Sequence, residues 1–412
     1  MRITKLLRSL LGVSRMFVRD VQLGHSSLIV DVRPSWKRPR CGGCGRRAPG
    51  YDRMTKPRFW QALAFGTVFV HLRYAIRRVA CRHCGVRVEQ VPWADPGRRF
   101  TRRFEEMVGY LAQVTDMTST AKLMGISWQT VSNIVARLVK ERLDDSRLDG
   151  VRRIGIDEFS YRKRHRYITT VVNHDTGKVI WATEGKGAAA VEAFFDALGP
   201  ERLAELELVT VDMAAGFLKA IRERAPHAKV VLDRFHVQRL ASDAVDHVRR
   251  DQWRELQGTE EGRVVKKTRF ALLKNPWNLT PKETTKLSQV QKDNAPLYRA
   301  YLLKETLAAA LDYRVPALAR RSLNRWLAWA SRSRLAPFVK LARTIRKHKD
   351  DVLAYVDERY TNGVVEGLNN RLRSVARRAF GYHSPEALIA MLFLVCGGIR
   401  LEPPIPGGPL RL

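Results

Sequence analysis

The sequence predicts a multidomain α/β protein in which a cysteine-containing basic region and a helical region precede an α/β core. Three observations support this class. Two close cysteine pairs lie between residues 41 and 84, apolar residues at helical spacing fill residues 101–143, and strand patterns alternate with helix patterns over residues 151–236. With 412 residues, 45% of them hydrophobic, the chain exceeds one ordinary domain and can bury several cores.

The chain is strongly basic, and the excess is concentrated towards the N-terminus. Lys and Arg number 74 against 41 Asp and Glu, for a formal net charge of +33. Residues 1–100 alone hold 21 basic and 5 acidic residues, a net +16. A solvated basic surface is the alternative, but an excess of this size favours a polyanionic partner, and nucleic acid is the first candidate.

The chain has no candidate membrane segment. No apolar run reaches the ~18 residues that a membrane-spanning helix needs. The basic start MRITKLLRSLLGVSR lacks the long apolar stretch and the cleavage site of a signal peptide. We therefore expect a cytoplasmic protein with no membrane partner. Five cysteines are also too few for a disulfide framework in a chain of this length.

The N-terminal quarter has the cysteine pattern of a zinc ribbon. Cys41 and Cys44 form one Cys-x-x-Cys pair, Cys81 and Cys84 form another, and a glycine follows each pair. Two such turns can complete a tetrahedral four-thiolate Zn²⁺ site. Residues 59–76 are expected to supply a β-hairpin that brings the turns together. Free buried cysteines and redox pairs are the alternatives, but two matched pairs fit a structural ion better.

The next segment has the pattern of a helix-turn-helix. TSTAKLMGISWQTVSNIVARLVK (residues 118–140) predicts a helix, a turn at Gly125 and a second helix. A small residue, Ala121, fits the first helix, and four apolar residues should hold the helices together: Leu123, Ile126, Val131 and Ile134. Such patterns also arise by chance in helical proteins. The exposed face of the second helix would present five residues to a DNA groove, namely Ser127, Trp128, Gln129, Thr130 and Asn133.

An α/β core is predicted to begin at residue 151. Five strands are expected, at residues 152–162, 166–174, 178–185, 205–212 and 228–233. Helices are expected at residues 188–199 and 213–225. Three meandering strands followed by alternating helices and strands match the ribonuclease-H-like topology. In that topology the first and fourth strands are central parallel neighbours.

Two aspartates close apolar runs on the strands that this topology makes neighbours. Asp157 closes RRIGID, and Asp212 closes ELVTVD. Adjacent carboxylates repel unless a cation lies between them, and burying an unpartnered carboxylate is costly. The pair therefore predicts an oxygen-rich site for Mg²⁺ or Mn²⁺, with two ions per active site, as in phosphoryl transfer.

Two further carboxylates compete with this pair as candidate ligands. Glu158 follows Asp157 directly, but strand alternation directs it to the opposite face, which disfavours it as a ligand. Asp233 ends the fifth strand and opens the segment Asp-Arg-Phe-His. Asp233 and His236 could hydrogen-bond to each other, to the metal ligands or to DNA. Alternatively, Asp233 caps the helix that begins there.

A charged segment with helical patterning, residues 237–355, precedes the third candidate carboxylate. Its tryptophans could stack on bases, although such residues more often lie in a core: Trp253, Trp277, Trp326 and Trp329. Glu366 opens a stretch with helical spacing inside TNGVVEGLNN. Arg373 and Arg377 recur on its predicted face, where they would contact phosphates or form a solvated surface.

These features, in this order, resemble the DDE transposases of the ISL3 family of bacterial insertion sequences. The resemblance rests on the zinc ribbon, the helix-turn-helix, GIDEF, VTVDM, LDRFHV and NGVVEGLNNRLR, and it spans nearly the whole chain. It implies that Asp157, Asp212 and Glu366 form the catalytic triad and hold the magnesium ions. The LDRFH segment is similar to a signature shared with Mutator-like transposases, which implies an accessory role for Asp233 and His236.

The features divide the chain into six segments. We expect a basic region with the zinc ribbon at 1–97, the helix-turn-helix at 98–143, the first part of the core at 151–236, an all-helical insertion at 237–355, the second part of the core with its catalytic Glu at 356–400, and a tail at 401–412.

The resemblance implies an enzyme that binds insertion-sequence ends and catalyses metal-dependent DNA strand cleavage and strand transfer. Its partners would be double-stranded terminal inverted repeats and target DNA, and in a bacterium it would associate with the nucleoid. Joining two ends implies a homodimer or a larger assembly. Two alternatives stay open. One is a DNA-binding regulator with an inactive core, and the other is a ribonuclease-H-like nuclease that cuts without strand transfer.

Overall fold

The chain folds as two units. The computed structural model describes residues 3–162, 166–358, 360, 367, 374, 382 and 384–404, so that Glu366, Arg373 and Arg377 lie outside the described residues. The first unit joins residues 1–143 to residues 378–412, and the second comprises residues 144–377.

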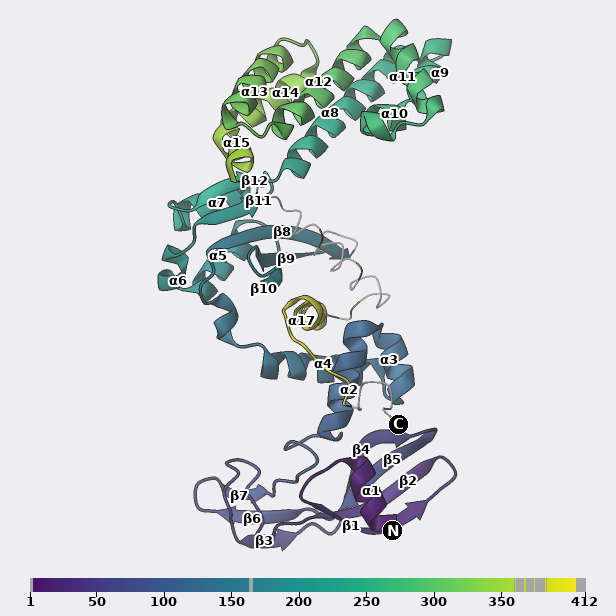
Figure 1. The fold of residues 1–412 in the computed structure, drawn as a ribbon, viewed down its shortest axis with the longest axis vertical. Helices are drawn as coiled ribbons and strands as arrows, with labels where there is room; N and C mark the ends of the chain where they lie inside the picture. Colours follow the sequence, from purple (N-terminus) through teal and green to yellow (C-terminus); the bar gives the residue numbers. More distant parts are fainter. Residues whose placement is uncertain are drawn as a thin grey trace, which may run out of the picture. The chain divides into compact units, whose positions relative to one another are not determined.

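Two small sheets form the N-terminal part of the first unit (Figure 1). After helix α1 (Ile3–Leu11), a four-stranded sheet has the order β1-β2-β5-β4, formed by β1 (Met16–Leu23), β2 (Ser27–Pro34), β4 (Arg58–Phe65) and β5 (Val68–Tyr74). A three-stranded sheet contains β3 (Gly50–Arg53), β6 (Arg77–Cys81) and β7 (Gly85–Val88). The expected hairpin forms as β4 and β5, but it belongs to the larger sheet. The second cysteine pair instead occupies the turn between β6 and β7.

The predicted helix-turn-helix is present. It follows α2 (Arg102–Val114) and consists of α3 (Met117–Met124) and α4 (Trp128–Arg142). Gly125 ends α3 in the left-handed conformation, with φ at 64°, and a Cβ there would lie 2.7 Å from the Phe69 ring. This position therefore requires glycine.

The prediction that Leu123 holds the two helices together was wrong. Leu123 is 67% exposed, whereas Met124 is buried. The buried residues of α3 follow the spacing i, i+3, i+4 and i+7, and this stripe excludes Leu123: Met117, Thr120, Ala121 and Met124.

The C-terminal helix α17 (Pro385–Cys396) packs against α4 and α2 in the first unit. The sequence-based division instead groups residues 356–400 with the α/β core. The helix is apolar almost throughout, so any face that covers it gains burial energy, and periodicity does not identify the partner. Within the first unit, the Gln113 amide donates to the Leu394 and Ile399 carbonyl oxygens at 2.6 and 2.8 Å. These bonds satisfy carbonyl groups at and beyond the end of the helix.

The second unit contains the predicted five-stranded sheet, in the order β10-β9-β8-β11-β12. Its strands are β8 (Arg153–Arg162), β9 (Arg166–Asn173), β10 (Lys178–Glu184), β11 (Leu208–Val211) and β12 (Lys229–Leu232). The first three are antiparallel, whereas β8, β11 and β12 are mutually parallel. A short 3-10 helix (Asp145–Leu148) precedes them, and the helices between the strands are α5 (Ala188–Leu198), the unpredicted α6 (Pro200–Ala204) and α7 (Ala215–Arg224). The fold class expected from the sequence is confirmed.

The segment after β12 is helical, as predicted (Figure 1). It contains α8 (Arg234–Glu255), α9 (Glu260–Lys266), α10 (Arg269–Leu273), a 3-10 turn (Pro276–Asn278), α11 (Pro281–Asp293), α12 (Ala295–Asp312), α13 (Pro316–Ser331), α14 (Ala336–Lys347) and α15 (Lys349–Glu358). Its apolar residues form one continuous core with the sheet. Trp326 belongs to that core and donates through Nε1 to the Leu303 carbonyl oxygen at 2.7 Å, whereas Trp277 is 76% exposed.

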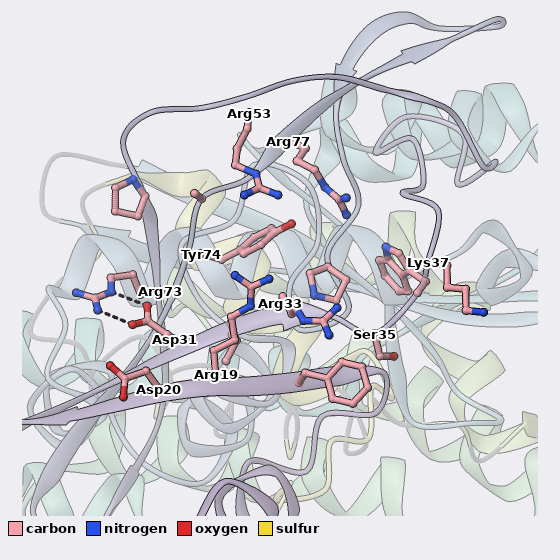
Figure 2. Close-up of a pocket in the computed structure, with 16 residues that line it drawn as sticks. Arg19, Asp20, Asp31, Arg33, Ser35, Lys37, Arg53, Arg73, Tyr74 and Arg77 are labelled. Atoms are coloured by element: carbon pink, nitrogen blue, oxygen red, sulfur yellow. Dashed lines mark hydrogen bonds and ion pairs between the residues drawn. The ribbon is translucent and has the colours of Figure 1, made fainter.

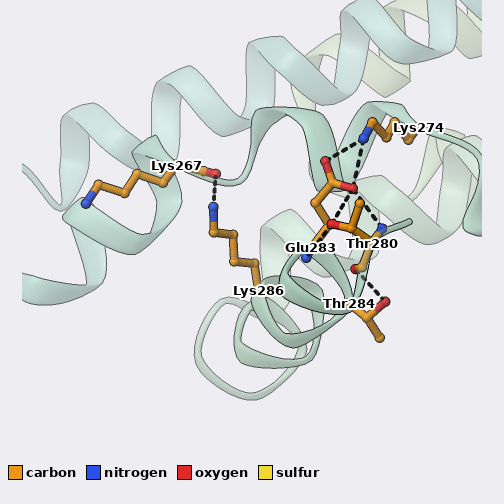
Figure 3. Close-up of polar contacts among 6 residues, drawn as sticks. All are labelled: Lys267, Lys274, Thr280, Glu283, Thr284 and Lys286. Carbon is orange, nitrogen blue, oxygen red and sulfur yellow. Dashed lines mark hydrogen bonds and ion pairs between the residues drawn. The ribbon is translucent and has the colours of Figure 1, made fainter. Parts of the chain in front are cut away.

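A polar cluster fixes the start of α11 (Figure 3). Thr280 and Glu283 form a capping box, in which each side chain accepts the other residue's backbone N–H. Lys274 Nζ lies 2.6 and 2.9 Å from the two Glu283 oxygens. The Lys274 ammonium, followed by the Thr280 N–H, lowers the pKa of Glu283 to about 2. Lys286 Nζ also donates to the Lys267 carbonyl oxygen at 3.4 Å, which links α11 to the end of α9.

Candidate active site

Strand register brings three aspartates to one edge of the five-stranded sheet. Thr210 in β11 pairs with Gly155 in β8, and Asp212 and Asp157 each lie two residues further along. Val211 pairs with the last residue of β12, and Asp212 and Asp233 each follow by one residue. Because side chains alternate along a strand, Asp157, Asp212 and Asp233 start from the same face of the sheet. This juxtaposition agrees with the sequence-based expectation for Asp157 and Asp212.

Backbone N–H groups orient the three carboxylates. Asp157 Oδ1 accepts from the Glu158 N–H at 2.7 Å, and Asp212 Oδ1 accepts from the Ala214 N–H at 2.9 Å. Asp233 is 4% exposed, and its Oδ1 accepts from the Phe235 N–H at 3.2 Å. The proposed helix cap is therefore present, because Asp233 is the N-cap of α8.

His236 stands in the first turn of α8 and faces two of these aspartates. Its Nδ1 lies 4.0 Å from Asp212 Oδ2 and 4.0 Å from Asp233 Oδ2, which is too long for a direct hydrogen bond. This nitrogen is buried and has no hydrogen-bond partner among the described residues.

Glu158 shares the electrostatic field of the site. Burial raises its pKa, the negative charges of Asp212 and Asp157 raise it further, and Lys186 opposes them. Strand alternation nevertheless directs its side chain to the opposite face from Asp157. The charges of the aspartates therefore act on Glu158, but Glu158 does not share their face of the sheet.

A buried histidine that the sequence pattern did not single out supports β11 just before Asp212. His174 Nε2 and Thr210 Oγ1 lie 2.7 Å apart, and both residues are buried. Burial lowers the pKa of His174 to about 4, so the ring is neutral at physiological pH. The position of His174 directly after the apolar strand β9 could have predicted this role. A polar side chain at the buried end of a strand needs a hydrogen-bond partner.

The four paired cysteines converge in the first unit. The sulfur atoms of Cys41, Cys44, Cys81 and Cys84 all lie within 4.8 Å of one another, and the Cys44 and Cys81 sulfurs are 3.6 Å apart without a disulfide. Tetrahedral Zn²⁺ with Zn–S bonds of about 2.3 Å places its sulfurs about 3.8 Å apart. This four-cysteine cluster therefore has the dimensions of a structural zinc site.

Helix α4 presents a polar face at its start. Ser127 caps the helix by accepting the Thr130 N–H at 3.2 Å. Gln129 and Asn133 are exposed, and Gln129 Nε2 donates to Asn133 Oδ1 at 3.0 Å. Trp128 differs from the sequence expectation of an exposed residue, because it is half-buried and packs edge-on against Tyr382, with the ring centroids 6.1 Å apart.

Together these features define a class of protein. A ribonuclease-H-like sheet with an acidic edge, in one chain with a helix-turn-helix and a four-cysteine ribbon, is typical of proteins that bind DNA and transfer its phosphoryl groups. The family assignment follows from three matches. A transposase family model of the ISL3 type matches residues 154–392, the helix-turn-helix domain of transposase family ISL3 matches residues 89–139, and the zinc-finger of the transposases IS204/IS1001/IS1096/IS1165 matches residues 37–84. The chain belongs to the ISL3 family of DDE transposases.

Two relatives resemble the chain over almost its whole length. The transposase for insertion sequence element IS1557 of Mycobacterium tuberculosis is 38% identical over 440 residues, covering 99% of this chain and 98% of the relative. The transposase for insertion sequence element IS1001 of Bordetella parapertussis is 29% identical over 388 residues, covering 93% and 95%. DNA phosphoryl transfer is the chemistry that this family implies. Across the described part of the chain, each helix is too short or too polar to cross a membrane.

Proposed function

We propose that this chain binds the ends of an insertion sequence and catalyses metal-dependent strand cleavage and strand transfer there. Asp157, Asp212 and Glu366 are the proposed catalytic carboxylates. The matched positions of Asp157 and Asp212 on adjacent parallel strands, in a chain of a DDE transposase family, carry the proposal. Glu366 is included because of its sequence motif alone, since it lies outside the described residues.

The acidic edge suits Mg²⁺ or Mn²⁺. Both ions prefer carboxylate oxygens, and a cation between Asp157 and Asp212 relieves the repulsion between like charges on neighbouring strands. Two bound ions would supply positive charge beside the attacking and leaving oxygens of a phosphodiester.

Asp233 and His236 are proposed to position the site. Asp233 caps α8 and so fixes the turn that carries His236. The His236 ring in turn limits the conformations open to the Asp212 carboxylate. Neither role requires direct contact with the reacting phosphate.

The proposed reaction has two steps, each forming one P–O bond and breaking one. Water attacks a phosphodiester at the element end and releases a 3′-hydroxyl. That hydroxyl then attacks a target phosphodiester in line and displaces the target's 3′-oxygen. The protein positions the strands and neutralises charge, with no covalent protein intermediate.

The DNA-binding surface is proposed to lie on α4. Ser127, Gln129 and Asn133 face outwards, with Trp128 and Thr130 beside them. Arg373 and Arg377 are proposed phosphate contacts on the motif that carries Glu366. Because two element ends must be joined, the active assembly contains at least two subunits.

A joining assay tests the proposal. The protein is incubated with element-end duplex, a supercoiled plasmid and Mg²⁺, and the expected products are nicked ends and covalent joint molecules. Cleavage without joint molecules would identify a nuclease, and binding without cleavage a regulator. Asp157→Asn should abolish both products while leaving end binding intact, because it removes a charge with little change of shape.

A further inference from the structure

A cavity with a basic lining lies between the two sheets of the first unit. Its volume is about 730 Å³. Six basic side chains line it, from β1, β2, β3, β5, β6 and the segment after β2: Arg19, Arg33, Lys37, Arg53, Arg73 and Arg77. Figure 2 shows Arg53 and Arg77 on one side of Tyr74, with Arg19 and Arg33 on the other.

Carboxylates neutralise only part of this charge. Arg73 makes two bonds to Asp31, at 2.6 and 2.5 Å. Arg77 forms an ion pair with Glu89, with Nη2 2.8 Å from Oε2, and the Glu89 side chain is fully buried. The Arg73 hydrogen bond lowers the pKa of Asp31, so that this carboxylate stays ionised and engaged with Arg73.

The other basic groups form no ion pair within the described part of the chain, although the charge of Arg19 also acts on Asp31 across the cavity. Arg19, Arg33, Lys37 and Arg53 form no ion pair among the described residues, and Asp20 is the one other acidic residue that lines the cavity. Arg33 lies over the Phe17 ring, with its guanidinium carbon 4.7 Å from the ring centroid. Gathering these cations around one space costs electrostatic energy unless an anion enters.

We propose that this cavity binds the phosphodiester backbone of DNA. Guanidinium groups match phosphate oxygens in geometry, and their placement on two sheets allows them to contact successive phosphates. Arg19 and Arg53 are exposed, so the cavity is open to solvent and can admit part of a long polymer. The inference rests on the proposed function in one respect, since it takes DNA as the ligand.

The cavity depends on residues that the family models leave out. The matched segments begin at residue 37, whereas β1 and β2 supply Arg19 and Arg33. To the residues of the zinc-ribbon segment, the β1-β2 hairpin therefore adds residues that bind the DNA backbone. Backbone contacts position a protein on DNA and raise its affinity, but they do not read base sequence.

Salt-dependent binding of the full chain to DNA tests the proposal. The variant Arg19→Gln/Arg53→Gln removes one unpaired arginine from each sheet. Its affinity is expected to fall on the order of tenfold at 0.15 M salt, equally for element-end duplex and for an unrelated duplex. The slope of log affinity against log salt should flatten by about 0.9 for each phosphate that the variant no longer neutralises.

The matched control is Lys5→Gln/Arg47→Gln, which removes the same charge from exposed positions of the same unit outside the cavity. It should change affinity less than threefold. Arg19→Lys/Arg53→Lys keeps the charge and should restore most of the slope, while zinc content and thermal unfolding report folding. A cavity variant that matches the control, or that weakens only element-end binding, overturns the proposal. Binding is measured without Mg²⁺, so a failure of strand transfer does not affect this test.

Discussion

Asp157 and Asp212 occupy matching positions on adjacent parallel strands, each two residues beyond the pair Gly155 and Thr210. Their side chains therefore leave the same face of the sheet, in a row that Asp233 continues directly after β12. A slip of one residue in either strand would move one carboxylate to the opposite face. The register of the sheet is thus the physical basis of the candidate active site.

Replacing Asp212 by Asn should lower the rate of DNA cleavage by at least about 10³-fold. Several kcal/mol of charge stabilisation is expected from metal-assisted phosphoryl transfer, and each ~1.4 kcal/mol corresponds to a factor of ten. Glu158→Gln is the matched control, since it removes a charge from the next residue after Asp157 on the opposite face. Single-turnover cleavage rates should stay within tenfold of the wild type for this control. A larger loss for Glu158→Gln than for Asp212→Asn would reverse the assignment.

Gln129→Ala should reduce discrimination between element-end DNA and unrelated DNA. The bond from Gln129 Nε2 to Asn133 Oδ1 leaves the Gln129 oxygen and the Asn133 amide nitrogen to meet base edges. Removing one base-edge hydrogen-bonding group costs about 1–3 kcal/mol for the specific sequence. Competition binding should show an affinity for the end duplex that is weaker by about 5- to 150-fold, as estimated from that range. Equal weakening on both duplexes would contradict a base-reading role.

Cys81→Ser should release zinc and unfold the ribbon, because a structural zinc site couples metal binding to folding. Zinc content by atomic absorption and the circular dichroism of the first unit check this expectation. Cys396→Ala is the control, since Cys396 lies in α17, away from the four-cysteine cluster. A Cys81→Ser protein that keeps one zinc per chain and full thermal stability would disprove the assignment.

His174 should make the protein less stable in weak acid. Its pKa in the folded chain is about 4, below the ordinary value of about 6.5, so between these values the unfolded state binds a proton that the folded state does not. Stability from this group is complete above about pH 6.5 and falls as the pH drops towards 4, by roughly 3 kcal/mol at most.

The variant His174→Gln should flatten this pH dependence. Urea denaturation of the variant and the wild type at pH 7.5 and pH 5 provides the comparison. His25→Gln, at an exposed position, should keep the wild-type dependence. An equal loss of stability in acid for wild type and His174→Gln would show that another group is responsible.

The sequence predicts most of the sheet and the neighbouring positions of two aspartates of the candidate site. Asp157 and Asp212 were identifiable because each ends an apolar run, and a carboxylate in a buried part of a sheet requires a partner. Asp212 follows the end of β11, whereas Asp157 lies within β8. The order of strands and helices then made those strands neighbours. The turn at Gly125 was also predictable, because a helix that ends in the left-handed conformation favours glycine there.

Three features depend on tertiary packing and could not be predicted from local sequence patterns. The residue Leu123 is apolar but lies outside the buried stripe of a helix only two turns long. Helix α17 is apolar on every side, so its pattern does not specify which elements cover it. The cavity between the two sheets combines residues from β1 to β6, which no local spacing brings together.

Locating the proposed catalytic ions is the most direct test of the account. Anomalous diffraction from crystals of the full chain bound to element-end duplex and Mn²⁺ would locate them. The expected result is an anomalous peak about 2.1 Å from carboxylate oxygens of both Asp157 and Asp212. Manganese bound by Glu158 without Asp212, or its absence from these aspartates in a complex competent for strand transfer, would contradict the account.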